Sequence, residues 1–257
     1  MLIVLSPAKS LDYESPVKTR KFTQPQFLDD AEKLVSTLRD YNPDQLSELM
    51  NISPKLGELN VERYANWHQP FDTDNARQAA FAFTGDVYVG LDINSLSAAD
   101  LDFAQKHLRI LSGLYGVLRP LDLMQPYRLE MGTSLQTEAG INLYQFWGSR
   151  VTDALNACLE KQKQPVLVNL ASNEYFRSVK EKALSADVIS PVFKDYKNGQ
   201  YKVISFYAKK ARGMMAAWII QNRVTRADDL QGFDVAGYKY STRESSAGKP
   251  VFLRKQA

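Results

Sequence analysis

Polar side chains that could carry out chemistry follow two predicted buried strands. Lys9 comes shortly after the apolar run Leu2–Leu5, and a Ser-Asn-Glu-Tyr sequence follows the β-branched run Val166–Leu170. In α/β folds, groups that contact ligands collect at such strand ends because the strand holds an exposed loop rigidly. The candidates for catalysis are Lys9, Glu130, Ser172, Glu174 and Tyr175.

These residue types suit an enzyme that acts on a phosphorylated or nucleotide-like small molecule. The lysine could bind a phosphate or act as a nucleophile, either glutamate could be an acid or a base, and the hydroxyl groups could position the substrate. Ion pairs that only stabilise loops would produce the same pattern, so both interpretations stay open. The sequence contains no Walker loop and no dinucleotide-binding glycine pattern, and we predict no cofactor.

Three basic residues, Lys209, Lys210 and Arg212, lie near the start of a predicted helix. At that position they oppose the helix dipole instead of complementing it. Lys209 and Arg212 face similarly, whereas Lys210 points away from Lys209 by about 100°. An anion bound at the helix start would explain this arrangement, and solvated surface charge is the alternative.

Charge is also unevenly distributed along the chain. Residues 26–107 contain 14 acidic and 6 basic residues, a net charge of −8, whereas residues 177–212 contain 9 basic and 3 acidic residues, a net charge of +6. This asymmetry indicates a surface in the later half that faces a polyanion. Charge runs are, however, often only solvated faces.

The segment Leu46–Arg63 resembles a helix-hairpin-helix, which we place at about residues 44–67. Ile52 would be the buried residue of the turn, Pro54 would take an early helical position that needs no N–H, and Lys55 would point outward. Backbone N–H groups at the start of the second helix would then face a phosphate oxygen, and the helix dipole would add positive potential. This predicts sequence-independent binding to the backbone of a duplex.

The segment departs from the usual pattern at two turn positions, where Asn51 and Ser53 replace glycines. Asparagine tolerates a left-handed backbone better than most residues, and a serine hydroxyl can donate to a phosphate. The alternative is a tight corner between two helices with no ligand. Nearby acidic residues favour that alternative: Glu48, Glu58 and Glu62.

The order of apolar runs predicts an α/β (mixed α+β) fold in one domain over residues 1–257, with a mixed sheet covered by helices. An Asn-Gly pair at 198–199 predicts a β-hairpin. Extended segments are expected at Leu2–Leu5, Phe81–Phe83, Val87–Val89, Leu108–Leu111, Val166–Leu170, Val188–Phe193 and Tyr201–Tyr207. Helices are expected at Phe27–Leu38, Ser97–His107, Gln145–Lys161 and Ala208–Asn222, and after a capping Ser172.

Composition excludes several classes of protein. Hydrophobic residues make up 44% and charged residues 24% of the chain, which is ordinary globular usage. The single cysteine, Cys158, has the spacing of a core residue and cannot form an internal disulfide. No apolar run is long enough for a signal peptide or a membrane span, so we expect a cytoplasmic protein with no membrane partner. Two histidines and one cysteine, without clustered carboxylates, predict no metal site.

Several longer stretches are specific enough to compare with known families: Ser6–Lys9, Gly113–Asp122, Gln125–Gly132, Asn169–Tyr175 and Phe206–Gly213. Together they closely resemble the YaaA family of bacterial peroxide-stress-resistance proteins, across nearly the whole chain. The resemblance implies a cytosolic protein that defends against hydrogen peroxide by limiting free iron and thereby Fenton damage to DNA. It also implies DNA binding and an α/β architecture with a helix-hairpin-helix beside a positively charged cleft.

We therefore expect a monomeric DNA-binding stress protein whose partner is double-stranded DNA. The residues expected to contact DNA are Lys9, Asn51, Ser53, Lys55, Arg119, Arg128, Lys209, Lys210 and Arg212. The alternative is the enzyme described above, acting in the same basic cleft. A duplex needs an open groove about 20 Å wide, whereas a small substrate needs a closed pocket with convergent polar groups.

Overall fold

A computed structural model describes residues 1–160, 162 and 165–255. Its central sheet has five strands in the order β4-β3-β1-β6-β7. All neighbours in this sheet are parallel except β3 and β4. The strands are β1 (Leu2–Leu5), β3 (Leu108–Ser112), β4 (Gly116–Leu118), β6 (Val166–Asn169) and β7 (Asp187–Ile189). Strand β1 is buried along its whole length, as expected of a central parallel strand covered on both faces.

A second sheet has the order β10-β11-β8-β9 and is also mixed. Its strands are β8 (Val192–Lys197), β9 (Gln200–Lys202), β10 (Lys239–Tyr240) and β11 (Val251–Arg254). A short antiparallel pair joins β2 (Arg77–Gln78) to β5 (Leu123–Met124). The predicted mixed α/β class is therefore confirmed, although the strands divide between separate sheets.

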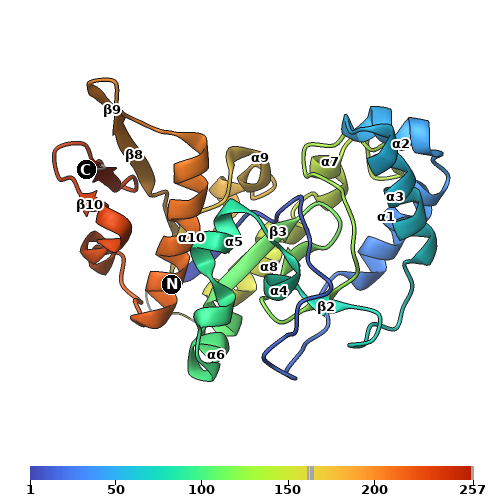
Figure 1. Cartoon of the computed structure of the whole chain (residues 1–257), viewed down its shortest axis with the longest axis horizontal. Helices are drawn as coiled ribbons and strands as arrows, with labels where there is room; N and C mark the ends of the chain where they lie inside the picture. The colour runs from blue at the N-terminus through green and yellow to red at the C-terminus, as the bar shows by residue number, and fades with distance from the viewer. Residues whose placement is uncertain (161, 163–164, 256–257) are drawn as a thin grey trace.

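Helices surround these sheets. They are α1 (Leu28–Arg39), α2 (Pro43–Met50), α3 (Pro54–Asn66), α4 (Ala79–Ala82), α5 (Asp86–Leu91), α6 (Ala98–His107), α7 (Leu143–Trp147), α8 (Arg150–Leu159), α9 (Asn173–Phe176) and α10 (Ser205–Gln221). Helices α1 to α3 lie at one end of the molecule, and α10 lies toward the other end together with the second sheet (Figure 1). Short 3-10 turns lie at Ile93–Ser95, Glu181–Ala183, Asp228–Gly232 and Val235–Gly237.

Several local predictions are confirmed. Ser97 and Asp100 form a reciprocal capping box at the start of α6. Asn198 and Gly199 have positive φ angles of 55° and 82° and connect β8 to β9 as a hairpin. The predicted strands Leu2–Leu5, Leu108–Leu111 and Val166–Leu170 correspond to β1, β3 and β6, and the helix predicted over Phe27–Leu38 corresponds to α1.

The extended segments predicted at Phe81–Phe83 and Val87–Val89 are wrong, because these residues belong mainly to the short helices α4 and α5. A short apolar run has no periodicity that distinguishes a strand from a buried helix. Tertiary packing decides the outcome here. A Cβ atom on Gly213 of α10 would lie 1.8 Å from the Val87 carbonyl oxygen, so α5 and α10 approach each other closely.

Three further boundaries differ from the predictions. The second hairpin strand stops at Lys202, and α10 begins at Ser205 instead of Ala208, so the end of the predicted strand Tyr201–Tyr207 is helical. The strand predicted over Val188–Phe193 is divided between β7 and β8, with Pro191 in the connection. The helix predicted from Gln145 is broken at Gly148, which has a φ of 54°, and its predicted end at Lys161 lies outside the described residues.

Candidate functional site

A polar pocket of about 420 Å³ lies where the parallel strands β1 and β6 end. Its walls come from the loop after β1, the turn before α5, the segment around α9 and one face of α10. All the candidates for catalysis line this pocket, together with two cations from α10: Lys9, Glu130, Ser172, Glu174, Tyr175, Lys209 and Arg212. The fold thus brings together residues that are distant in the sequence.

Two serines hold the loops that follow β1 and β6. The Ser172 backbone N–H donates to Ser6 Oγ at 2.8 Å, and the two hydroxyl oxygens lie 3.3 Å apart. Ser172 Oγ also accepts from the Tyr175 N–H and caps α9, as predicted. The Tyr88 hydroxyl donates to the Ser6 carbonyl at 3.1 Å. Both loops therefore have little freedom to rearrange.

Glu130 joins the lysine of the first loop to a neighbouring arginine. Its Oε1 atom lies 3.2 Å from Lys9 Nζ and 3.2 Å from Arg128 Nε. Its Oε2 atom is buried and has no hydrogen-bond partner among the described residues. A buried carboxylate oxygen is normally satisfied by a donor, so a ligand or a water molecule would supply one here.

The carboxylate and phenol on α9 are suited to holding a ligand. Glu174 Oε1 accepts a hydrogen bond from the Gly132 N–H at 3.0 Å. Burial raises the pKa of the Tyr175 hydroxyl above its ordinary value. The phenol therefore keeps its proton at neutral pH and can donate a hydrogen bond, but it is a poor base.

Two cations from α10 indicate what kind of ligand the pocket could bind. Arg212 is partly buried, and burial lowers the pKa of its guanidinium group. Neither Arg212 nor Lys209 forms an ion pair with any carboxylate in the described parts of the chain. A desolvated guanidinium normally has an anionic partner, so this wall is suited to binding an anion.

The helices predicted around Asn51 are present, with the expected turn conformation. Asn51 has φ 49° and ψ 58°, in the left-handed region. Ser53 precedes α3 without a side-chain capping bond, Pro54 is the first helical residue, and Lys55 is exposed. Whether this turn binds a phosphate stays a prediction.

The other residues expected to contact DNA do not line the pocket. Arg119 forms an ion pair with the buried Asp122 at 2.8 Å and donates to the Gln24 carbonyl. Lys210 is exposed, while its backbone carbonyl packs against Gly90 of α5. The turn residues Asn51, Ser53 and Lys55 lie on the separate α2–α3 hairpin.

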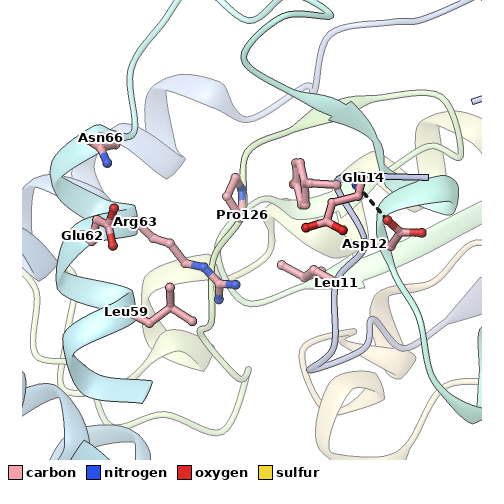
Figure 2. A pocket seen from close by; sticks show the side chains of 9 residues that line it. Leu11, Asp12, Glu14, Leu59, Glu62, Arg63, Asn66 and Pro126 are labelled. Atoms are coloured by element: carbon pink, nitrogen blue, oxygen red, sulfur yellow. Dashed lines mark hydrogen bonds between the residues drawn. The ribbon is translucent and has the colours of Figure 1, made fainter. Parts of the chain in front are cut away.

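A second cavity, of about 550 Å³, lies between α3 and residues 11–14. Figure 2 shows Arg63 reaching from α3 toward Leu11 and Pro126, with Glu14 on the opposite wall. Burial lowers the pKa of Arg63. Across the cavity, hydrogen bonds from the side chain and N–H of Ser15 and from the N–H of Glu14 lower the pKa of the Asp12 carboxyl group to about 2.

Neighbouring stretches of the chain line the two cavities. Residues 6–10 line the polar pocket, and residues 11–14 line the second cavity. Arg63 is not among the residues predicted from the sequence to contact a ligand. A helical pattern could have revealed it, because Lys55, Leu59 and Arg63 recur every four residues along one face of α3.

Residues 1–160, 162 and 165–255 contain no group of three or more His, Cys, Asp or Glu side chains able to hold a metal ion. Within the same ranges, no helix has both the length and the apolar character needed to cross a membrane.

Comparison with known proteins gives full-length matches. The family model described as "Peroxide stress protein YaaA" matches residues 1–244. A "UPF0246 protein" of Cellvibrio japonicus (strain Ueda107) is 59% identical over 256 residues, which cover 100% of this chain and 99% of the relative. A "UPF0246 protein" of Shewanella loihica (strain ATCC BAA-1088 / PV-4) is 57% identical over 256 residues, with the same coverage.

Proposed function

Since the chain belongs to the peroxide stress protein YaaA family and has a role in peroxide stress, we propose that it protects DNA by binding the phosphate backbone of the duplex. The observation that carries this proposal is the pair of cations on α10, Lys209 and Arg212, which line the pocket and form no ion pair among the described residues. The exposed start of α3, with Lys55, would add a second phosphate contact.

Backbone binding offers a physical route to less iron damage. Duplex DNA carries a condensed layer of cations, and a protein that neutralises phosphates with lysine and arginine releases them. Ferrous ions bound to phosphates would be displaced in the same way, so less iron would react with peroxide beside the DNA. The protein would limit Fenton chemistry at the DNA without itself binding iron.

Duplex affinity measured by fluorescence anisotropy, from about 50 to about 200 mM salt, tests the proposal. We expect little sequence preference and a steep loss of affinity with salt. Arg212→Gln should reduce the slope of log Kd against log salt by about 1, the change expected for one lost phosphate contact. Lys55→Glu should weaken binding to all sequences. An undetectable or salt-independent interaction would refute duplex binding.

The controls use the exposed Lys182, which lies outside both cavities. Lys182→Gln and Lys182→Glu match the charge changes of the two test variants and should leave affinity nearly unchanged. If Lys55→Glu behaved like Lys182→Glu, the α2–α3 hairpin would be only a structural corner.

A second candidate function is an enzyme for a phosphorylated or nucleotide-like small molecule. It is favoured by the pocket itself, whose volume of about 420 Å³ is within the usual range for small-ligand sites. Arg212 and Lys209 would hold the phosphate, Lys9 or Glu130 would transfer a proton, and Ser172 would position the substrate.

Thermal stability in the presence of nucleoside phosphates, free nucleosides and inorganic phosphate tests this function. A ligand that occupies the pocket should raise the melting temperature, and Arg212→Gln should remove the increase for phosphorylated ligands. Duplex binding without stabilisation by any small phosphate would exclude the enzyme.

A further inference from the structure

Four of the eight large exposed apolar side chains found in the described ranges lie within residues 196–206, on the β8–β9 hairpin and at the start of α10. Tyr196 is 40% exposed, Tyr201 36%, Val203 55% and Phe206 57%. The other exposed apolar side chains found in the described ranges are far apart in the sequence: Phe22, Leu59, Val89 and Ile141. Exposed apolar groups concentrated in one short stretch of chain indicate an interaction surface more strongly than scattered ones do.

The aromatic rings of this surface are held on regular backbone. Tyr196 and Tyr201 are direct cross-strand partners, with ring centroids 5.2 Å apart and planes at 66°. Phe206 lies on the first turn of α10, and its ring contacts Tyr207 with centroids 5.6 Å apart. Because a tight turn and a helix position these rings, binding to them would cost little ordering entropy.

The charge around the rings is positive. Lys197, Lys209 and Lys255 are exposed, and Lys255 Nζ lies 5.1 Å from the centre of the Tyr196 ring. Asp195, the single acidic residue between positions 192 and 212, is buried and accepts hydrogen bonds from Arg254 and Tyr238. Its charge is therefore neutralised inside the protein and does not offset the exposed lysines.

Exposed aromatic faces among lysines match the two chemical features of an unpaired nucleic-acid strand. Bases stack on the rings, and phosphates pair with the cations. We infer that the β8–β9 hairpin and the first turn of α10 form a stacking platform for unpaired bases of a single nucleic-acid strand. A duplex does not offer its base faces, so this site differs from the backbone contacts proposed above.

The platform lies next to the polar pocket. Phe206 and Lys209 are three residues apart and share a face of α10, and Lys209 lines the pocket. A strand stacked on the platform would therefore continue toward Arg212. This inference rests on the proposed function only in that the partner is nucleic acid, since none of its aromatic residues lines either cavity.

Anisotropy with a fluorescent single-stranded oligonucleotide tests the platform, and 2-aminopurine in the strand reports stacking directly. Phe206→Ala should weaken single-strand binding about 5- to 150-fold, the equivalent of one lost stacking contact, and should restore 2-aminopurine fluorescence. Phe206→Tyr should retain most of the affinity because it keeps the ring. Ile141→Ala, at another exposed apolar position, should have no effect.

The two nucleic-acid proposals fail separately. Lys55→Glu should weaken duplex binding and spare the single strand, whereas Phe206→Ala should do the reverse. Single-strand affinity that is absent, or unchanged in both Phe206→Ala and Tyr201→Ala, would overturn the platform. A dimer that dissociates in Phe206→Ala, without any oligonucleotide binding, would assign the surface to a second copy of the chain instead.

Discussion

Glu130 affects both the electrostatic potential of the pocket and the proton transfer that could occur there. One oxygen of its carboxylate engages both Lys9 and Arg128, while the other oxygen is buried without a partner among the described residues. The carboxylate therefore reduces the positive potential that Lys9 would otherwise present to a phosphate. In an enzyme, the same carboxylate would instead be available to exchange a proton with the substrate.

Glu130→Gln separates these roles. The substitution removes one negative charge and leaves Lys9 free to face an anion, so duplex affinity at low salt should rise about two- to fourfold and the gain should shrink as salt increases. Glu181→Gln, at an exposed position outside the pocket, should change affinity little. A loss of turnover on a nucleotide substrate, with duplex affinity unaltered, would favour the enzyme.

At the scale of elements, the close crossing of α5 and α10 positions the pocket's cations. A Cβ atom on Gly90 would lie 2.1 Å from the Lys210 carbonyl oxygen, and one on Gly213 would lie 1.8 Å from the Val87 carbonyl oxygen. Both helices also contribute residues to the pocket wall. The separation of these helices therefore determines where Lys209 and Arg212 lie relative to Lys9.

Gly213→Ala should force α5 and α10 apart. We expect a loss of about 1–3 kcal/mol in the free energy of unfolding, because the obstructing atoms are backbone and cannot rotate away. Duplex affinity should fall as well, because Arg212 is the residue before Gly213 and would be displaced when α10 moves. Gly232→Ala is the matched control, since its new methyl group would lie 3.6 Å from Trp218, an ordinary contact. Equal urea midpoints for the two variants would contradict this account.

Local sequence signals predicted the elements that depend on local interactions. The Ser97 capping box, the Asn-Gly hairpin turn and the apolar run of β1 each have a cause within a few residues of sequence. Helices α4 and α5 were missed because their conformation depends on packing against distant segments, including α10. The sequence predicts that α10 begins at Ala208, after its actual start at Ser205, because Phe206 and Tyr207 are aromatic residues that favour strands.

At the scale of the whole molecule, the candidate site was only partly predictable. The parallel pairing of β1 and β6 places Lys9 and Ser172 at one edge of the sheet, as their positions after two strands suggested. Arg119 lies away from that edge because it follows β4, which runs antiparallel to β3, and it pairs with Asp122 only three residues along the chain. Arg63 shares a helical face with Lys55 and Leu59, but its place in the second cavity depends on the docking of α3 against residues 11–14, which that spacing does not specify.

A buried acid links strands of the second sheet, and its arginine partner contacts α10. Asp195 of β8 accepts from Arg254 Nε at 2.6 Å and from the Tyr238 hydroxyl at 2.8 Å. The Arg254 guanidinium also lies 4.9 Å from the centre of the Tyr207 ring on α10. Asp195 therefore joins β8 to β11, and its partner Arg254 in turn contacts the helix that carries the pocket's cations.

Asp195→Ala should cost about 3–5 kcal/mol in the free energy of unfolding, because it leaves a nearly buried Arg254 without its counter-charge. Tyr238→Phe removes one hydrogen bond from the same carboxylate and should cost only about 1 kcal/mol. Glu244→Ala breaks the more exposed ion pair with Lys194 and should cost less than about 1 kcal/mol. Urea denaturation of the three variants checks this order, and a loss for Asp195→Ala no larger than that for Glu244→Ala would show that the second sheet is held on α10 mainly by its apolar contacts.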